Sequence, residues 1–325
     1  MNIFITGSNG FIGKRLTEVA LKENFQCTLS MRNHSVDSLN NDNLSYVYRT
    51  IAGNTDWSGA FASIDCVIHT AALVHQMNGA ENNHYQGINT YGTLNLAQQA
   101  ADSGVKRFIF VSSIKVNGES TEPGLPFKPD DNFVPTDPYG LSKYEAEVGL
   151  RKIAHQTGME VVIIRPPLVY GPGVKANFAS MLKWMNKGLP LPLGGINENK
   201  RSLVSLDNLV NLIITCISHP NAANQTFLVS DDDDVSTSQL LTNMATALDV
   251  PCRLLPIPSS WFIIAAKLIG KPAISQRLCG SLQVDISQTK ELLNWKPPYS
   301  SIKSMKKTAH AFLESLKYFD SKNMK

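Results

Sequence analysis

Short apolar runs alternate with longer segments of helical periodicity through the first two-thirds of the 325-residue chain. Six runs are rich in β-branched and aromatic residues, as strands are: MNIFITG, QCTLSM, DCVIHTAA, KRFIFVSS, MEVVIIRP and NQTFLVS. Apolar residues recur at helical spacing in the segments FIGKRLTEVALKEN, INTYGTLNLAQQAADSG and GLSKYEAEVGLRKIAHQTG. Continuously apolar strands separated by helices predict a parallel sheet that is covered on both faces. The expected fold class is therefore α/β, a Rossmann-type doubly wound parallel sheet.

The pattern changes after Arg165, where Pro and Gly gather in RPPLVYGPGVKANF and KGLPLPLGGINENKRS. Such stretches indicate loops and short elements, and we expect them to form a smaller C-terminal lobe. The predicted Rossmann domain comprises residues 1–168 together with about 202–230. Residues of about 169–201 and 231–325 are expected to form the second lobe, which binds the substrate.

The most apolar stretch of the second lobe is WFIIAAKLIG at residues 261–270. A transmembrane helix needs about 20 apolar residues, so this stretch is too short to span a bilayer. It also contains Lys267. We expect a packed helix here, with a contact to a membrane surface as the alternative.

Composition and charge narrow the functional classes. Hydrophobic residues make up 43% of the chain and charged residues 18%, which is typical of soluble globular proteins. The net charge is +3 and the basic residues are scattered, so no nucleic-acid partner is expected. Five cysteines without a CxxC pair indicate buried thiols in a reducing compartment. No apolar signal segment follows Met1, which predicts a cytoplasmic protein. The run Asp231–Asp234 is expected to be a solvated loop, and no metal site is predicted.

A glycine-rich turn follows the first predicted strand directly, in the sequence TGSNGFIG. Gly7, Gly10 and Gly13 permit a tight turn, close approach of a pyrophosphate and close packing of helix on strand. The following helix then presents its free N–H groups and its dipole to the phosphates. The loop residues predicted to bind a nicotinamide dinucleotide are Gly7, Asn9, Gly10, Phe11, Ile12 and Gly13.

Tyr139 and Lys143 lie four residues apart in PYGLSKYEAE, on one face of a predicted helix. A free phenol has a pKa near 10 and is a poor base, and a neighbouring positive charge lowers that pKa. Tyr139 can then exchange a proton with a sugar hydroxyl or ketone. Two further YxxxK matches are expected to be surface pairs: Tyr299/Lys303 and Tyr318/Lys322.

Two serines, Ser112 and Ser113, end the predicted strand KRFIFVSS. Ligands of open parallel sheets bind outside the carboxyl ends of the strands, so these hydroxyls face the predicted site. A polar cap of the strand end is the alternative. Because Tyr139 follows on the next helix, we expect Ser113 to donate a hydrogen bond to the substrate oxygen.

The motifs TGSNGFIG, HTAA, FVSSIKVNG, YGLSK and RPPLVYGPG together resemble the extended short-chain dehydrogenase/reductase family. The resemblance is to its nucleotide-sugar epimerase/dehydratase branch, and within it to the UDP-glucose 4-epimerase-like subgroup. It covers nearly the whole chain, since LCGSLQVDISQTKELLNWKPP is similar to the closing element of that branch. One departure concerns the residues after VVIIR, where galactose epimerases commonly show Tyr-Phe-Asn and this chain has Pro166-Pro167-Leu168.

The resemblance implies roles for individual residues. The catalytic residues are Ser113, Tyr139, Lys143 and Asn89. Beside the glycine-rich turn, the cofactor-binding residues are Arg32, Ala71, Ala72, Ser112, Tyr139, Lys143 and Pro166. The substrate-binding residues are Ser113, Asn177, Arg201 and Arg277. For Asn89 and Arg201 an ordinary surface position is the alternative, and His69 in HTAA is expected to be a partly buried structural histidine. The family implies a UDP-sugar substrate and a homodimer that pairs helices into a four-helix bundle.

Three reactions are consistent with these residues. The favoured one is 4-epimerisation of a UDP-hexose or UDP-N-acetylhexosamine, in which the C4 hydroxyl is oxidised, the ketone rotates and hydride returns to the other face. The second is NADPH-dependent reduction of a UDP-4-keto-6-deoxy sugar in surface-polysaccharide synthesis. The third is a cofactor-binding regulator without catalysis, which the complete set of Ser113, Tyr139 and Lys143 disfavours.

The choice between NAD and NADP depends on the residues at the end of the second predicted strand. An acidic residue there binds the ribose hydroxyls and repels a 2′-phosphate, and this chain has Met31 and Arg32 instead. Arg32 is able to pair with a 2′-phosphate, so we expect NADP(H) to be tolerated. The alternative is that Arg32 stacks on the adenine, which suits NAD equally well.

Overall fold

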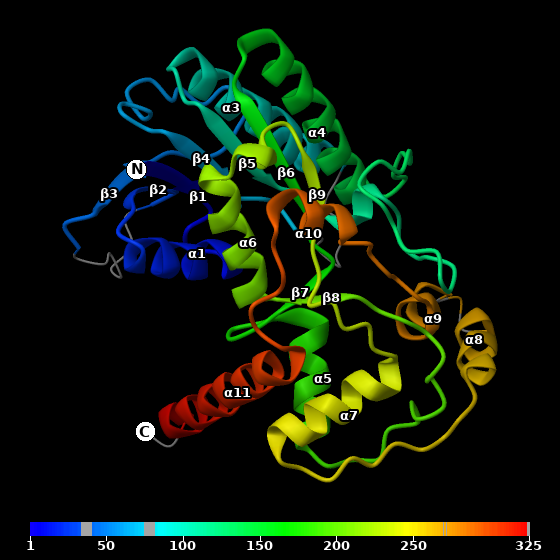
Figure 1. Cartoon of the computed structure of the whole chain (residues 1–325). Coiled ribbons are helices and arrows are strands. Elements are labelled where there is room, and N and C mark those ends of the chain that lie inside the picture. Colours follow the sequence, from blue (N-terminus) through cyan, green and yellow to red (C-terminus); the bar gives the residue numbers. More distant parts are fainter. Residues whose placement is uncertain (34–40, 75–81, 269, 271, 324–325) are drawn as a thin grey trace.

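A computed structural model describes residues 1–33, 41–74, 82–268, 270 and 272–323. Its main sheet has seven parallel strands in the order β3-β2-β1-β4-β5-β6-β9 (Figure 1). The strands are β1 (Asn2–Thr6), β2 (Gln26–Met31), β3 (Leu44–Tyr48), β4 (Cys66–His69), β5 (Arg107–Val111), β6 (Glu160–Arg165) and β9 (Thr226–Leu228). This order and direction confirm the predicted doubly wound sheet.

Two apolar cores cover the two faces of the sheet, because successive side chains of a strand point to opposite faces. On β1, Ile3 and Ile5 pack against the helices α1 (Phe11–Lys22) and α6 (Leu206–Ser218). Phe4 points the other way, into the core formed with α3 (Thr93–Asp102) and α4 (Pro138–Thr157). Before α3 the chain forms α2 (Asn82–Tyr85) and a π-helix, η1 (Gln86–Gly92).

A second lobe lies beyond the carboxyl ends of the strands (Figure 1). Two short parallel strands, β7 (Leu168–Tyr170) and β8 (Leu203–Ser205), connect it to the sheet domain. Its core is formed with α5 (Ala176–Asn186), α7 (Thr237–Leu248) and α11 (Ser301–Asn323). Its remaining helices in the described residues are α8 (Ser259–Leu268) and α9 (Pro272–Cys279). The helix α10 (Ser287–Leu293) instead packs on β9, and its Leu293 joins the core of the main sheet. The residue boundaries of the two predicted domains stay a prediction.

Several elements differ from the sequence-based expectation. The edge strand β3 was not predicted, because its residues are only partly buried and lack a continuous apolar run. The segment after Arg165 holds long helices such as α11, besides the expected loops. α8 forms where a packed helix was expected and contacts α9, but it leaves Trp261 and Leu268 exposed. No helix of the described ranges is long and apolar enough to cross a membrane.

The run Asp231–Asp234 is a loop, as expected, and Asp232 and Asp233 are exposed, but Asp231 is buried and makes structural contacts. The Asp231 carboxylate is buried and accepts hydrogen bonds from the Tyr170 hydroxyl at 2.6 Å and the Asn208 side chain at 2.7 Å. Burial raises the pKa of Asp231, although these hydrogen bonds oppose the shift. Asp232 pairs with Lys290. The described residues contain no cluster of metal-ligating side chains.

Candidate active site

The glycine-rich turn lies at the carboxyl end of β1 and has no room for side chains. Gly7 has a φ of +70°, and its carbonyl accepts a 2.8 Å hydrogen bond from the Gly10 N–H. A Cβ on Gly13 would lie 2.2 Å from that same carbonyl oxygen. Gly10 is the N-cap of α1 and offers no side chain to the first N–H groups of the helix. The turn therefore fits the pyrophosphate of a dinucleotide, which binds such free N–H groups.

Four further residues that were predicted to bind the cofactor lie at the turn or follow the segment that packs on it. Asn9 is exposed at its tip, whereas Phe11 and Ile12 are half-buried in the first turn of α1. The predicted HTAA segment packs on the turn, since a Cβ on Gly7 would lie 2.7 Å from the Ala71 nitrogen. Ala72, the next residue, is half-buried.

Arg32 is placed next to this turn by the strand pairing. β1 and β2 pair in parallel with Thr6 opposite Ser30, so Arg32 follows directly after the carboxyl end of β2. The Arg32 side chain is exposed, whereas Met31 is buried in the sheet. A cation therefore occupies the position from which an acidic residue would reach the ribose.

Tyr139 and Lys143 share the face of α4 that lies over β5. The Asp137 carboxylate caps the helix by accepting the Gly140 N–H at 3.1 Å, and Pro138 opens the first turn. Lys143 is only 1% exposed; its ammonium donates to the Val111 carbonyl at 3.0 Å. The same ammonium lies 4.4 Å from the ring centre of Phe110.

The three predicted catalytic groups meet at the end of β5. Tyr139 is half-buried and shares a hydrogen bond with Ser113. Its ring packs edge-on against Tyr85, with 6.2 Å between the ring centres. The hydroxyl of Ser113 also accepts the Lys115 N–H at 3.3 Å, because Ser113 caps the short 3₁₀ helix η2 (Ile114–Val116).

In the protein alone, burial shifts the pKa values of both Tyr139 and Lys143. It raises the pKa of Tyr139 to about 12, although the hydrogen bond with Ser113 lowers it in part. Burial also lowers the pKa of Lys143 to about 7, against the attraction of Glu147. In the protein alone the pKa of Tyr139 is thus raised rather than lowered, because loss of hydration outweighs the hydrogen bond with Ser113.

A buried acid–base network supports α4 one turn beyond Lys143. The Glu147 carboxylate is fully buried and accepts two hydrogen bonds from Arg165, at 2.6 and 2.9 Å. It also accepts the Ser112 hydroxyl at 2.6 Å. Arg165 in turn donates to the Asn117 side chain at 2.9 Å. This network was not predicted from the sequence. In it the Ser112 hydroxyl faces α4.

Asn89 lies in the π-helix and is almost completely buried, so the surface alternative for it is wrong. Its amide donates to the Leu73 carbonyl at 3.0 Å and to the Ser142 hydroxyl at 3.1 Å. Its oxygen accepts the Leu73 N–H at 2.8 Å. Asn89 thereby connects the segment after HTAA to α4. π-Helices of this kind occur often at functional sites.

His69 is a structural residue, as expected, and is more deeply buried than the sequence indicated. Its two ring nitrogens bond to the hydroxyls of Thr6 at 2.7 Å and Thr93 at 2.9 Å. Burial lowers the pKa of His69 to about 3. Pro166 is also buried, and its carbonyl accepts the Ile114 N–H at 3.0 Å beside the Ser113 cap.

Two of the three residues predicted to bind the nucleotide lie together. The Arg201 guanidinium donates to the carbonyls of Arg277 and Gly280, both at 3.0 Å, at the C-terminus of α9. Arg201 is partly buried, which lowers its pKa, so the surface alternative for it is wrong. Arg277 and Asn177 are exposed, on α9 and on the first turn of α5.

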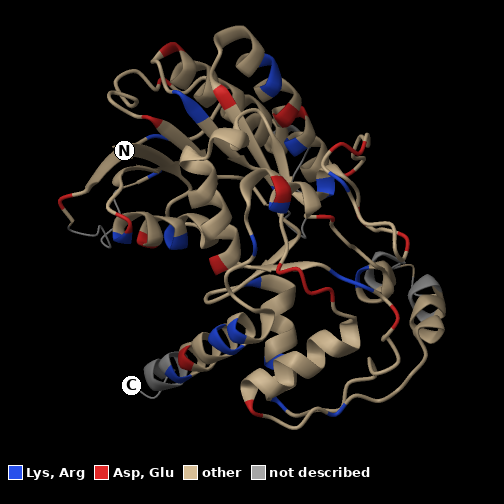
Figure 2. Ribbon diagram, viewed as in Figure 1, with Lys and Arg blue, Asp and Glu red and all other residues tan. Residues whose placement is uncertain are grey.

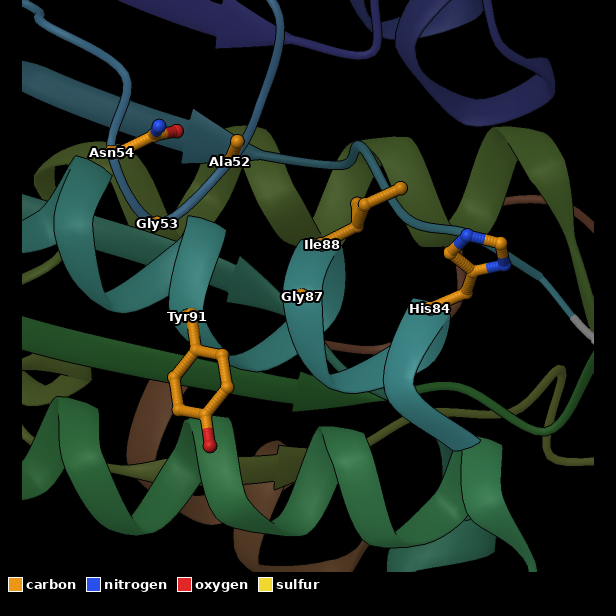
Figure 3. A pocket seen from close by; sticks show the side chains of 7 residues that line it. All are labelled: Ala52, Gly53, Asn54, His84, Gly87, Ile88 and Tyr91. Carbon is orange, nitrogen blue, oxygen red and sulfur yellow. The ribbon is translucent and has the colours of Figure 1, made fainter. Parts of the chain in front are cut away.

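A separate pocket lies on the outer side of the π-helix (Figure 3). It is lined by Ala52, Gly53, Asn54, His84, Gly87, Ile88 and Tyr91. None of these is a predicted site residue, and Tyr91 is exposed to solvent there. The pocket has no acid–base group other than His84 and Tyr91, so we place the candidate chemistry at Tyr139 instead.

The glycine-rich turn at β1 and the Tyr139–Lys143 pair at β5 define a Rossmann-fold protein of the short-chain dehydrogenase/reductase class. Comparison with known proteins makes the assignment more specific. A model of the NAD dependent epimerase/dehydratase family matches residues 3–230. The chain belongs to this family and is an enzyme.

Individual relatives agree with that assignment. The chain is 52% identical to a UDP-glucose 4-epimerase of Vibrio cholerae over 97% of this chain and 96% of the relative. It is 27% identical to the N-acetyl-alpha-D-glucosaminyl-diphospho-ditrans,octacis-undecaprenol 4-epimerase of Escherichia coli O157:H7 over 88% of each chain. The Bacillus cereus UDP-glucuronic acid 4-epimerase, solved in complex with NAD, has the same fold: TM-score 0.79, 21% identity, 98% of each chain covered.

Proposed function

We propose that the protein is an NAD-dependent 4-epimerase of a UDP-hexose or UDP-N-acetylhexosamine. The observation that carries this proposal is the meeting of Tyr139, Lys143 and Ser113 at the carboxyl end of β5. The 52% identity to a UDP-glucose 4-epimerase over nearly the full length supports the substrate class.

The residues present fit a nicotinamide dinucleotide. The turn from Gly7 to Gly13 and the N-terminus of α1 would hold the pyrophosphate. Ala71, Ala72 and Pro166 would lie along the rest of the cofactor. When bound, the nicotinamide supplies hydride chemistry, taking a hydride from the sugar carbon and returning it.

Tyr139 would take the proton of the C4 hydroxyl and later return it. A phenol with a pKa of about 12 is too basic to be ionised at neutral pH, so it needs a cation beside it. Lys143 supplies that cation when protonated, and the Glu147 carboxylate favours this charged form. Ser113 would donate a hydrogen bond to the sugar oxygen, and Asn89 would hold the segment after HTAA against α4.

The nucleotide end of the substrate would lie in the second lobe. The Arg201 guanidinium lies at the C-terminus of α9, beside the backbone of Arg277, and guanidinium groups suit the oxygens of a diphosphate. Asn177 is assigned to the same end on the resemblance alone. We further propose a homodimer built on α3 and α4, and a cytoplasmic location.

A second candidate is the NADPH-dependent reduction of a UDP-4-keto-6-deoxy sugar. Arg32 favours it, because an exposed cation stands where an acidic residue would repel a 2′-phosphate. Pro166-Pro167-Leu168 also departs from the galactose epimerases, so substrate handling differs at that point. The name of the Escherichia coli relative gives a sugar substrate whose diphosphate is linked to a lipid. Such a lipid-linked sugar is a variant of the first proposal and should be tested beside UDP-sugars.

Turnover of UDP-glucose and UDP-N-acetylglucosamine by the purified protein, without added cofactor, tests the epimerase proposal. Tyr139→Phe should lower turnover about 10²–10⁴-fold, the usual contribution of an acid–base group, and should leave bound NAD in place. Tyr144→Phe changes a tyrosine on the same helix and should stay within about twofold. Net consumption of NADPH with a UDP-4-keto sugar, and no turnover of the other two sugars, would establish the reductase instead.

A further inference from the structure

α8 exposes apolar side chains that a helix of a soluble domain normally buries. Trp261 is 68% exposed, Ile264 57% and Leu268 83%, and Ile263 is also exposed. The helix packs on α9 at the outer edge of the second lobe (Figure 1). Adjacent large apolar residues that remain exposed in this way mark an interaction surface.

The charge of this segment is entirely positive. Residues 250–284 contain four basic residues and no aspartate or glutamate. In Figure 2 the described residues of α8 and α9 carry no acidic side chain. Arg253, six residues before the start of α8, is exposed. The surface therefore carries exposed apolar side chains together with a positive charge, which is complementary to an anionic partner.

A second copy of the chain is a poor fit to this surface. In a two-fold interface the same patch faces itself, so the exposed Arg253 and Arg277 would be present on both sides, and residues 250–284 have no acid to pair with them. Like charges that are brought together in an interface cost affinity. A bilayer that contains anionic lipids instead pairs its headgroups with the basic residues and accepts tryptophan and aliphatic side chains below them.

We propose that α8 and α9 form a docking surface for an anionic phospholipid bilayer. Trp261, Ile263, Ile264 and Leu268 enter the headgroup boundary, and Arg253 lies at the level of the phosphates. The same segment is joined to the proposed substrate end of the lobe, because the C-terminal carbonyls of α9 hold Arg201. Docking brings that end of the enzyme to the membrane surface, whichever sugar it acts on.

Sedimentation of the purified full chain with vesicles tests the proposal. Wild type should bind vesicles of phosphatidylglycerol and phosphatidylcholine at low salt, bind pure phosphatidylcholine much more weakly, and dissociate as salt screens the charges. The double variant Trp261→Ser/Ile264→Ser should lose about tenfold or more of the affinity for the anionic vesicles. Its turnover of a soluble UDP-sugar should be unchanged, which also shows that it is folded.

The matched control is Leu125→Ser/Val134→Ser, which removes two exposed apolar side chains from a loop of the described chain outside α8. It should bind anionic vesicles like wild type. The proposal is overturned if wild type does not bind these vesicles, or if both double variants bind equally well. It is also overturned if Trp261→Ser/Ile264→Ser instead abolishes self-association in light scattering, because a second copy would then cover α8. Vesicle binding is measured without turnover. The result can therefore be interpreted even if the epimerase proposal fails.

Discussion

Lys143 is deeply buried, and its pKa lies close to neutral pH. Its ammonium has one carbonyl partner and the face of Phe110, and burial lowers its pKa to about 7. The fully buried carboxylate of Glu147 follows four residues later on the same helix. Because Arg165 fixes that carboxylate with two hydrogen bonds, the negative charge that favours protonated Lys143 is held in place. The charge state of the site thus depends on a pair of residues that cannot reach the substrate.

Arg32→Asp tests the choice of cofactor at a single residue. If Arg32 pairs with a 2′-phosphate, the change should shift the ratio of NADP to NAD affinity about 10–100-fold toward NAD, the worth of one charge-assisted hydrogen bond. Arg32→Gln removes the cation without adding an acid and should give a smaller shift in the same direction. Titration of the two dinucleotides against the purified protein measures both ratios, and an unchanged ratio would refute the role in phosphate binding.

The sequence motifs located the candidate catalytic residues but not the residues that support them. Tyr139, Lys143 and Ser113 were predictable, because their types and their positions after predicted strands carry a chemical meaning. Glu147 and Arg165 were not, because a charged residue on a predicted helix or at a strand end normally points to solvent. Only the pairing of β6 with α4 in space shows that these two charges are buried together.

Three helices far apart in the sequence are joined by one carboxylate. Asp207, in the first turn of α6, accepts a 2.7 Å hydrogen bond from Arg15 of α1 and another from Lys307 of α11. Burial alone raises the pKa of Asp207, but these two hydrogen bonds outweigh it and the pKa is lowered. The N-terminus of a helix also favours a negative charge. Asp207 therefore connects the sheet domain to the last helix of the chain.

Asp207→Asn should lower the free energy of unfolding by about 1 kcal/mol at pH 7, or about 1–2 °C in melting temperature for a chain of this length. The folded-state pKa is below the unfolded value of 3.8, so the stabilisation is complete above about pH 4. It is lost as the pH falls through the folded pKa, where the variant and wild type should converge. Thermal melts between pH 3 and pH 7 measure this. Glu18→Gln removes only the exposed partner of Arg15 and should change less; a constant gap at every pH would contradict the prediction.

At the scale of elements, periodicity predicted the six strands of the main sheet that carry a continuous apolar run and missed the partly buried edge strand β3. β1, β4, β5 and β6 read as apolar runs because helices cover both of their faces. β3 lies at the edge of the sheet and is only partly buried, so its sequence lacks that signal. The π-helix was also not predictable, since its one extra residue per turn is stabilised by the tertiary contacts of Asn89.

The whole molecule is predicted to be a homodimer. α4 exposes Val148, and the π-helix before α3 exposes Tyr91, so this side of the molecule carries apolar groups that a helix pairing would bury. Light scattering after size exclusion should give twice the 35.7 kDa mass of the chain. Val148→Glu should shift the population to monomer at micromolar concentration, because a charge would be buried at the centre of the interface. Val134→Glu, on an exposed loop, is the control; a monomeric wild type would contradict the prediction.

The arrangement of the two lobes was predictable only in outline. The Pro- and Gly-rich sequence after Arg165 indicated a second lobe, but not how the chain returns from it to the sheet. The return includes Ser281 and Val284, which bridge to Thr121 and Phe127 of the loop that follows β5. Such pairings join residues more than 150 positions apart, and no local pattern encodes them.

The position of α6 has a consequence for how the chain is made. α6 packs on α1 and over β5, and its residues Leu209 and Ile213 complete the core on one face of the sheet. The strand residues Ile3 and Ile5 of the same core are synthesised about 200 positions earlier. At roughly 5–20 residues per second on the ribosome, part of that apolar face stays uncovered for roughly 10–40 s. During that interval the growing chain offers the binding surface that chaperones recognise, and it loses that surface only when α6 has emerged.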